Sequence, residues 1–557
     1  MYSKYFFSNF YRYFSASPKL PSFSAIPSKF RRQAIQEAQK ALIDFLHGTK
    51  NLPYTYAEHI GKNSLFSLSN LISKVAFSPY SFSSSFKKYL RYHPINEFEF
   101  FFESIGIDYS EVSGFLPLNK FFFSEDGTVL NSACTLSGFG FPWNRLGKLY
   151  KEKSSIFSRS SVELTAKLSE FKKHGFTNVS VIGICLAFPD VLSEEGEVGG
   201  EIDALLTDLK LICLDLDLES SVEGNVDSWY EVCRKIRVFY DLNVEKGKLG
   251  ELMGRRKSIL LEHGEDVLAK MAEYFCRFGV KKEEAALLLL EVPELLNLDL
   301  ETPLVCVLKL LKDFNLSSEE LKNVSHTYGH VLGTNRMANL PHVMKALDLH
   351  AWFFNKIING NHQLFASYVV NNPIEDHDKE FRDGLEKIQL SRTPIHTMGK
   401  LNFLHGIGFG ENAVTMRILA HLHGTNSELQ ERFDCLLHSG VEFSKLCKMV
   451  RMHPKILNQN PETLEQKVNF LCGEMGSSLD CLDVFPGFLC FDLEKRIKPR
   501  FRFHMWLREK GLCTKNYSIA SIIATSEKTF VARLSKMHPD APKHWIERFP
   551  HSTPLVS

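Results

Sequence analysis

Seven cations lie close together near the carboxyl end of the sequence, and three aromatic residues lie between them. Lysines and arginines in a row can neutralise successive phosphates, and such contacts supply most sequence-independent affinity for nucleic acids. The tract therefore predicts contact with nucleic acid. The alternative is a structural role for Arg496 and Arg500, which would pair with carbonyls or acids of the helices before them. The tract comprises Lys495, Arg496, Lys498, Arg500, Arg502, Arg508 and Lys510, with Phe501, Phe503 and Trp506.

Two smaller basic groups are weaker candidates for the same contact. Solvated surface charges are the alternative interpretation for both. If the chain repeats regularly, however, equivalent positions recur along one face, and cations there would follow a phosphate backbone. The groups are Arg255, Arg256 and Lys257, and, around Pro454, Lys448, Arg451 and Lys455.

No pattern in the sequence nominates a catalyst, a cofactor or a metal. None of the twelve Cys forms a C-x-x-C pair, and the twenty-one His show no H-E-x-x-H spacing. Gly406, Gly408 and Gly410 resemble a dinucleotide loop only superficially, because no strand precedes them. We therefore expect a protein that is not an enzyme and that uses no cofactor or metal.

The elements that would position these cations form a repeat. An apolar residue is followed four positions later by Gly, Asn or Asp, and then at once by another apolar residue. Gly and Asn tolerate the left-handed conformation that ends helices, and the apolar residue after them can fold back on the last turn. Successive cap residues lie 34, 35, 68, 36, 36, 33, 60 and 32 positions apart. The caps are Gly106, Gly140, Gly175, Asn243, Gly279, Asn315, Asp348, Gly408 and Gly440.

A second landmark follows each cap at a fixed distance. Pro189, Pro293 and Pro454 lie fourteen residues after their caps, and proline ends a helix. A second, shorter helix therefore lies between cap and proline, and Ser317 with Glu320 predicts a capping box at the start of one. Seventeen residues after the caps lie apolar residues that we expect to plug the core: Phe123, Phe157, Leu192, Leu260, Leu296, Leu332, Phe365 and Leu457.

Each unit is thus helix, capped turn, helix, proline stop and apolar plug. Such a unit cannot bury its own apolar face, so neighbours must stack. The sequence predicts an all-α solenoid of about ten two-helix units of roughly 35 residues, over residues 95–510. The alternative is an irregular helical bundle. Residues 194–227 and 370–395 fit the repeat worst and are degenerate units or insertions.

Charge is uneven although the net charge is only +1. Residues 1–36 contain six Lys and Arg and no acid, residues 194–227 contain eleven acids and only Lys210, and residues 495–557 contain thirteen cations and four acids. A polyanion site should therefore lie away from the acidic insert at 194–227. Residues 37–94 are an ill-defined helical region, and residues 511–557 a basic carboxy-terminal tail.

The amino-terminal residues 1–36 have the composition of an organelle transit peptide. They are rich in Ser, Phe and Tyr, and the first acid is Glu37. A secretory signal would need an unbroken apolar run, which Asn9 and Arg12 interrupt. We expect import into the mitochondrion, with the chloroplast as the alternative. Apolar stretches such as residues 181–188 are too short to cross a bilayer, so no membrane association is expected.

Two strings resemble the mitochondrial transcription termination factor (mTERF) family. Residues 460–471, NPETLEQKVNFL, are similar to the opening of the family's repeat, with Pro461, Leu464, Lys467, Val468 and Leu471 at matching places. Residues 493–500, LEKRIKPR, are similar to the string L-x-x-R-I-x-P-R near the end of many members. The resemblance covers roughly residues 95–535, is strongest over 270–510, and looks like that of a divergent plant-type organellar member.

The resemblance implies a right-handed superhelix whose basic concave face holds nucleic acid, typically double-stranded DNA, in organellar transcription termination or initiation. Other members act in RNA splicing or ribosome assembly, so RNA remains an alternative ligand. Proteins of the transcription machinery are possible further partners, and we expect a monomer. A different kind of function, a helical-repeat adaptor that binds a protein, is compatible with the near-zero net charge and the acidic insert.

Overall fold

A computed structural model describes residues 26–193, 199–216, 224–254, 256–364, 379–513 and 517–549, together with residues 23, 218 and 222. The regular secondary structure of these residues is almost entirely helical, and the one sheet among them is a two-stranded ribbon, so the predicted all-α class is confirmed. The chain divides into an amino-terminal unit, residues 1–269, and a carboxy-terminal unit, residues 270–557. Of the expected transit peptide at residues 1–36, residues 1–22, 24 and 25 lie outside the described residues, whereas residues 28–30 form a 3-10 helix and residues 31–36 begin the first α-helix.

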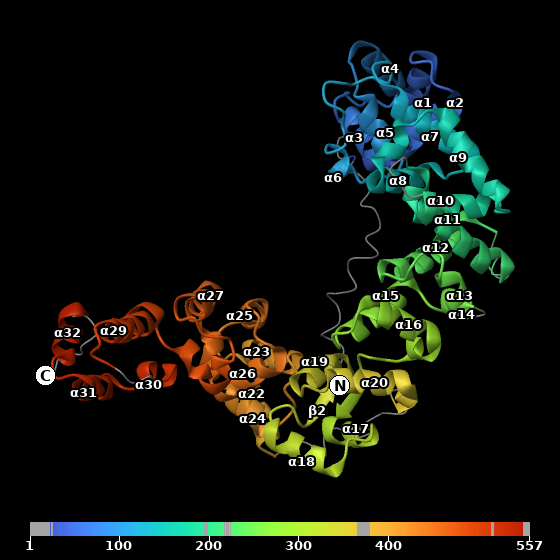
Figure 1. The fold of residues 1–557 in the computed structure, drawn as a ribbon. Coiled ribbons are helices and arrows are strands. Elements are labelled where there is room, and N and C mark those ends of the chain that lie inside the picture. Colours follow the sequence, from blue (N-terminus) through green and yellow to red (C-terminus); the bar gives the residue numbers. More distant parts are fainter. Residues whose placement is uncertain are drawn as a thin grey trace. The chain divides into compact units, whose positions relative to one another are not determined.

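The amino-terminal unit begins with a small helical group in which α1 packs on α2 and α4, and continues with α7 packed on α9 and α10 packed on α12 (Figure 1). Its elements are η2 (Ser28–Phe30), α1 (Arg31–Gly48), α2 (Tyr54–Asn63), α3 (Leu65–Ser73), α4 (Phe82–Tyr92), α5 (Glu97–Ser104), α6 (Tyr109–Val112), α7 (Thr128–Phe139), η3 (Trp143–Arg145), α8 (Leu146–Glu152), η4 (Ser154–Ser158), α9 (Ser161–Lys173), α10 (Asn178–Ala187), η5 (Pro189–Leu192), α11 (Gly199–Lys210), η6 (Leu211–Asp215), α12 (Val226–Asp241), α13 (Leu249–Met253) and α14 (Ser258–Glu262).

Helix α15 (Glu265–Cys276) leads into the carboxy-terminal unit. In that unit β1 and β2 pair antiparallel, with Val305 opposite Asn335. The elements are α16 (Lys282–Glu291), η8 (Pro293–Asn297), β1 (Leu304–Cys306), α17 (Val307–Asp313), α18 (Ser318–Thr327), β2 (Thr334–Arg336), η9 (Met337–Asn339), α19 (Leu340–Ala346), α20 (His350–Lys356), η10 (Ile357–Asn361), α22 (Lys379–Gln389), α23 (Pro394–Gly406), α24 (Ala413–Leu419), α25 (Asn426–His438), α26 (Phe443–Met452), η11 (Pro454–Asn458), α27 (Pro461–Asn469), η12 (Phe470–Glu474), α28 (Cys481–Val484), η13 (Pro486–Cys490), η14 (Leu493–Ile497), α29 (Lys498–Glu509), α30 (Ile519–Ile523), α31 (Glu527–Met537) and α32 (Ala541–Arg548).

Every cap residue that the repeat predicts has a positive φ, from 59° at Asp348 to 124° at Gly140. The hydrogen bonds explain the spacing of the sequence pattern. At Gly440 the cap N–H donates to Leu437 O over 2.9 Å, and the N–H of Val441 donates to Leu436 O over 3.1 Å. This pair of hydrogen bonds is the Schellman motif, in which the apolar residue after the cap contacts the apolar residue five positions before it. The predicted triplet is thus the two ends of that contact and the left-handed residue between them.

The structure adds two caps that extend the series, Gly476 and Gly511, both with positive φ. The N–H of Leu512 donates to Leu507 O, which repeats the bond made at Gly440. Gly476 escapes the sequence pattern because polar Ser477 follows it.

The proline stops are also present. Pro189, Pro293 and Pro454 each begin a short 3-10 helix, and the residue before each has left helical angles, with ψ near 72° to 73°. The predicted plugs Phe123, Phe157, Leu192, Leu260, Leu296 and Leu457 are buried, whereas Leu332 is half-buried and Phe365 lies outside the described residues.

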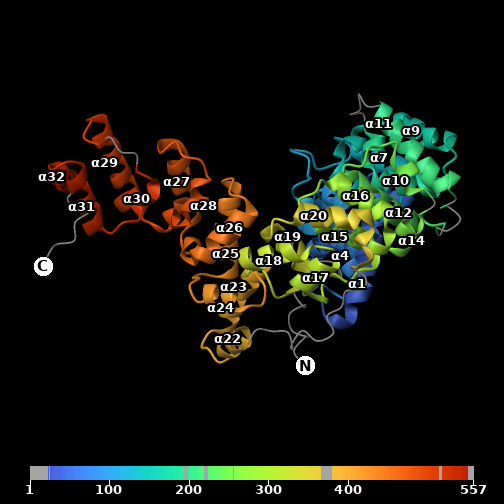
Figure 2. The same cartoon turned by 60° about the horizontal axis from the view of Figure 1, so that its bottom comes forward.

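In the carboxy-terminal unit the two helices of each repeat lie in two rows. Helices α23, α25 and α27 pack on one another and form the first-helix row, while α24, α26 and α28 form the second-helix row. Figure 2 shows these pairs following one another along the unit. Positions that are equivalent in successive repeats therefore lie side by side along one row.

The regular stacking of helix pairs is interrupted before α23, near the stretch 370–395 where the sequence repeat is weak. Before α23, helix α19 packs on α26, and the loop at Gly408 and Gly410 packs against the segment that leads to β2. A Cβ on Gly410 would lie 2.3 Å from Leu332 O, so the glycine permits this close backbone approach. Close backbone packing thus explains Gly410 and also Gly408, whose Cβ would lie 2.7 Å from His342 O, but not Gly406, which has no atom within 4 Å.

No helix within the described ranges combines the length and the apolar character needed to cross a membrane.

Candidate nucleic-acid interface

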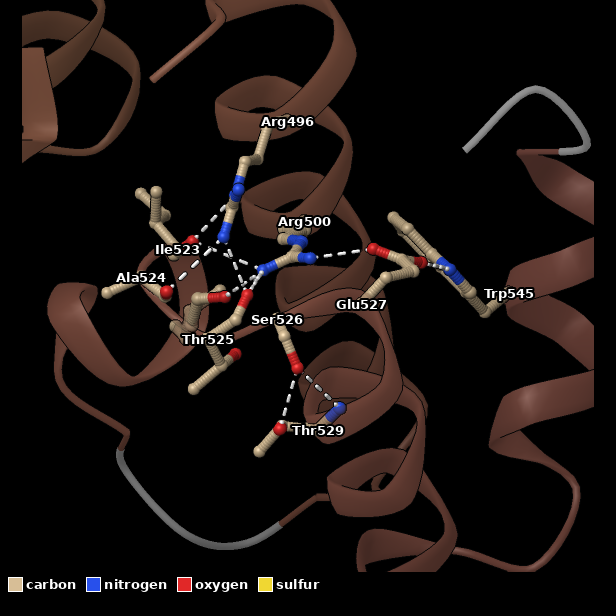
Figure 3. A network of polar contacts seen from close by, with 10 residues as sticks. Arg496, Arg500, Ile523, Ala524, Thr525, Ser526, Glu527, Thr529 and Trp545 are labelled. Carbon is tan, nitrogen blue, oxygen red and sulfur yellow. Dashed lines mark hydrogen bonds and ion pairs between the residues drawn. The ribbon is translucent and has the colours of Figure 1, made fainter. Parts of the chain in front are cut away.

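The two arginines of the string at residues 493–500 form the centre of a buried polar network (Figure 3). Arg500 is 2% exposed, and its guanidinium donates to the carbonyls of Ile523 and Thr525 over 3.1 and 2.7 Å. It also forms an ion pair with Glu527 at 2.6 Å, and Glu527 accepts from the indole N–H of Trp545 at 2.8 Å. The guanidinium is therefore fully used within the protein.

Arg496 has the same kind of role. Its Nε donates to Ile523 O over 2.9 Å, and its Nη2 donates to Thr525 O over 2.6 Å. The structure thus favours the structural alternative for Arg496 and Arg500, although the carbonyls belong to the segment after the tract and not to the preceding helices. We therefore leave Arg496 and Arg500 out of the proposed interface, and the prediction of nucleic-acid contact is kept only for the other cations of the tract.

Two other repeats contain a similar bond from a cation to a backbone carbonyl, at a different position relative to the cap. Lys235 Nζ donates to Leu260 O over 2.8 Å, and Arg432 donates to Leu457 O over 2.9 Å. Each cation lies eight residues before its cap, and each carbonyl belongs to the plug residue of the same unit. A cation on the first helix therefore recurrently satisfies the carbonyl exposed where the second helix stops, as orphan helix-end carbonyls require.

The remaining tract residues are distributed over different faces of η14 and α29. Lys498 forms an ion pair with Glu494, and Arg502 forms a bidentate pair with Glu474 at 2.6 and 2.8 Å. Lys495 and Arg508 are exposed. These cations are accessible, but those held by carboxylates would exchange a protein partner for a phosphate.

The second basic group, around Pro454, gives the clearest geometry. Arg451 and Lys455 line one cavity of about 580 Å³ together with Arg417, which the sequence analysis did not single out. The cavity lies between α24, the end of α26, η11 and the last residue of η13. The described residues that line it include no acid: Val414, Arg417, Ile418, His421, Arg451, Met452, His453, Pro454, Lys455 and Cys490.

Proline explains why a cavity forms here. Pro454 ends α26 and turns the chain into η11, so the ends of neighbouring second helices separate. Arg417 lies nine residues after its cap, and Arg451 lies eleven after the next. Because α24 has no proline stop, the landmark that drew attention to Arg451 was missing at Arg417. Its distance from the cap also differs from that of Arg451, so the repeat gives no signal for Arg417.

Positive charge is not neutralised around this cavity. Within the described part of the chain, Arg417, Arg451 and Lys455 form no ion pair, although Arg451 donates to Thr327 O over 2.7 Å. Nearby, Lys448 lies 4.6 Å from the ring centre of Tyr328. Cations uncompensated by carboxylates create a positive potential that attracts polyanions.

The pKa values of buried histidines in the same unit are lowered in part by these and other cations. Burial, together with Arg451 and Lys448, lowers the pKa of His330 to about 3. Burial, Lys345 and Arg277 lower the pKa of His342 to about 4. The charged groups that act on these imidazoles are therefore cations.

The first-helix row has the opposite charge. The helices α25 and α27 present acids, several of which act together on the thiol of Cys435, whose pKa is raised by burial and then by Glu465, Glu462 and Glu431. Acids thus outnumber the cations Arg432 and Lys467 on α25 and α27, whereas α24 and α26 themselves carry only cations among their charged residues, although Lys445 of α26 pairs with acids of the next turn and of α28. The acids are Glu428, Glu431, Asp434, Glu462 and Glu465.

The third basic group lies in the amino-terminal unit. Arg256 is exposed at the turn between α13 and α14, thirteen residues after its cap at Asn243, while Arg255 lies outside the described residues. His421 and His453 occupy the same position relative to their caps at the cavity. Arg256 therefore occupies, in its own repeat, the position that these two histidines occupy at the cavity.

Comparisons with known proteins agree with the repeat. A family model described as mTERF matches residues 216–348 and 390–531. The gap between these ranges includes most of the stretch 370–395, where the sequence repeat is weak. Additional capped units, such as those ending at Gly106 and Gly140, lie before the matched ranges.

Three relatives from Arabidopsis thaliana are similar to this chain. The mitochondrial transcription termination factor MTEF18 is 56% identical over 524 residues, which cover 94% of this chain and 94% of the relative. The chloroplastic factor MTERF8 is 22% identical over 73% of this chain and 83% of its own length. The mitochondrial factor MTERF15 is 28% identical over 22% of this chain and 27% of its own length.

Proposed function

The chain belongs to the mTERF family of organellar nucleic-acid-binding regulators and is a mitochondrial member, and from this premise we propose that it regulates mitochondrial transcription, including termination, by binding double-stranded DNA. The names of all three relatives, transcription termination factors, support the choice of transcription over other steps of gene expression.

One observation carries the proposal, namely the uncompensated positive charge on the second-helix row. Arg417, Arg451 and Lys455 face a common cavity without a carboxylate, and Lys448 lies on the same helix as Arg451. Duplex DNA carries one charge per ~1.7 Å of its axis, and its condensed counterions are released when cations replace them. Side chains without protein partners lose no ion pair when they contact phosphate.

The accessible cations of η14 and α29 extend the proposed interface. Lys495 and Arg508 are exposed, and Lys498 and Arg502 lie at the surface in ion pairs with Glu494 and Glu474. Arg256, at its equivalent position, is the proposed contact of the amino-terminal unit. The role of Arg496 and Arg500 in this proposal is to hold α29 in place.

The test is an electrophoretic mobility shift of the mature chain on mitochondrial duplex DNA and on RNA of the same sequence, at two or more salt concentrations. We expect the duplex to bind more tightly, with affinity that falls steeply as salt rises, because each neutralised phosphate contributes about 0.9 to the slope of log K against log salt. Preferential RNA binding would contradict the DNA assignment. Binding that is weak and insensitive to salt would reject the nucleic-acid role and favour a protein adaptor.

A further inference from the structure

We propose that the cavity at Pro454 is a discrete site for a single nucleotide, with the phosphate against Arg417, Arg451 and Lys455 and the base against the apolar wall. This inference deepens the proposed function and rests on it. The choice of a nucleotide over other anions follows from the proposal that the protein binds nucleic acid. The nucleotide belongs either to a bound strand or to the free pool, and both present a phosphate oxyanion beside a base.

The charge of the lining selects an anion. Its charged side chains are three cations, and none of the described residues around the cavity is an acid. Other cavities of the molecule differ in this respect. The cavity along α25 contains Glu431 and Asp434, and the one near α9 contains Glu170 and Asp203.

The three cations come from three elements and line the same cavity. Arg417 lies on α24, whereas Arg451 and Lys455 lie on either side of the α26 to η11 turn. Arg451 uses its Nη1 on Thr327 O, a bond that fixes the guanidinium while its other nitrogens remain as donors. A guanidinium held in this way binds phosphate with little further loss of side-chain freedom.

Size and apolar lining argue for more than a phosphate ion. At about 580 Å³ the cavity has the volume of sites that enclose a small organic ligand. Val414, Ile418, Met452 and Pro454 supply an apolar wall beside the cations. Met452 is 52% exposed, so a flat ring that covers it would remove apolar surface from water.

The experiment is isothermal titration of the full mature chain with adenosine 5′-monophosphate, with adenosine and with inorganic phosphate. We expect the monophosphate to bind at least tenfold more tightly than either fragment, because only it engages both the cations and the wall. Equal binding of inorganic phosphate, or no binding of the monophosphate, would overturn the proposal.

Variants locate the site. Arg417→Gln and Lys455→Gln should each weaken monophosphate binding about tenfold or more, since hydrogen bonds to charged groups contribute about 1.5–3 kcal/mol. Val414→Asp should abolish it by placing a carboxylate in the cavity. The control is Lys445→Gln on α26, the helix of Arg451, because Lys445 is already paired with Asp480 and Asp483 at 3.1 Å. Equal losses in the control and in Arg417→Gln would overturn the assignment, and melting temperatures identify any variant that fails to fold.

The outcome is separable from that of the proposed function. A chain that shifts duplex DNA but does not bind the monophosphate contradicts this inference alone. A chain that binds the monophosphate but no nucleic acid supports the site and contradicts the proposed function. Competition assigns the source, because a monophosphate that displaces the DNA occupies the place of a strand nucleotide, and one that binds alongside it is free.

Discussion

Residue type alone did not distinguish binding cations from structural ones. Arg500 and Arg502 are two positions apart in the same tract, yet one is buried against Ile523 and Thr525 and the other lies on the surface beside Glu474. Their partners lie 25 and 28 residues away in the sequence. The density of charge was visible in the sequence, whereas the partners that determine each role follow only from the fold.

The buried arginine should be necessary for the packing of the last helices. Arg500→Met removes the ion pair with Glu527 and one of the donors to the carbonyls of Ile523 and Thr525, and breaking a buried pair costs about 3–5 kcal/mol. We expect faster hydrogen–deuterium exchange over residues 519–548 and a lower melting temperature. The control Arg502→Gln removes a surface pair and should change neither. Weaker nucleic-acid binding with unchanged exchange would instead make Arg500 a ligand contact.

Buried histidines should make the protein sensitive to mild acid. Burial lowers the pKa of His330 to about 3 and that of His405 to about 4, from 6.5 in an exposed chain. The unfolded chain therefore takes up protons first as the pH falls, so stability is complete above about pH 6.5 and is lost progressively toward pH 4.

Melting temperatures measured from pH 7.5 to 4.5 check this expectation. The decline should be shallower in His405→Phe, which removes one such group, and unchanged in His421→Gln, because His421 is exposed. A wild-type melting temperature that stays constant down to pH 5 would show that these imidazoles are not held neutral by the fold.

At the scale of elements the sequence was most informative where one local motif determines the backbone. The cap triplets were recognisable because the Schellman motif needs a left-handed residue and two apolar ends within six positions, and all nine predicted caps have positive φ. The stacking near Gly408 could not be predicted, because it depends on contacts between segments about 80 residues apart, such as the bonds from Asn412 to the carbonyls of His330 and Leu332.

Two kinds of glycine should respond differently to alanine. At Gly440 the φ of 94° strains an alanine, while the nearest atom to the new Cβ is the flexible end of Leu479 at 3.3 Å, so we expect a loss of about 1 kcal/mol. At Gly410 the new Cβ would meet two backbone carbonyls at 2.3 and 2.5 Å, and the loss should be larger. Urea denaturation measures both. Gly473→Ala, with no atom within 4 Å, is the control, and a Gly410 variant as stable as this control would contradict the close approach.

At the scale of the whole molecule the net charge of +1 is the sum of segregated charges rather than a sign of a neutral surface. The sequence showed unevenness along the chain, at residues 194–227 and 495–557, but not between the two helices of one repeat. That segregation appears only when α24 and α26 lie in one row and α25 and α27 in the other. It favours a nucleic-acid partner over the adaptor that the net charge allowed.

Opposite changes of net charge on the two rows test whether location or total charge governs binding. The basic-row variant lowers the net charge by three and combines Arg417→Gln, Lys448→Gln and Lys455→Gln. The acidic-row variant raises the net charge by three and combines Glu431→Gln, Asp434→Asn and Glu465→Gln. The basic-row variant should bind duplex DNA more weakly, with a salt slope flatter by about 2.7 if three phosphate contacts are lost. At physiological salt the screening length is about 8 Å, so charges on the far row act weakly on a bound phosphate, and the acidic-row variant should change the affinity less than about twofold. Equal and opposite changes of affinity in the two variants would mean that total charge governs binding. That result would contradict the proposal that the second-helix row is the interface.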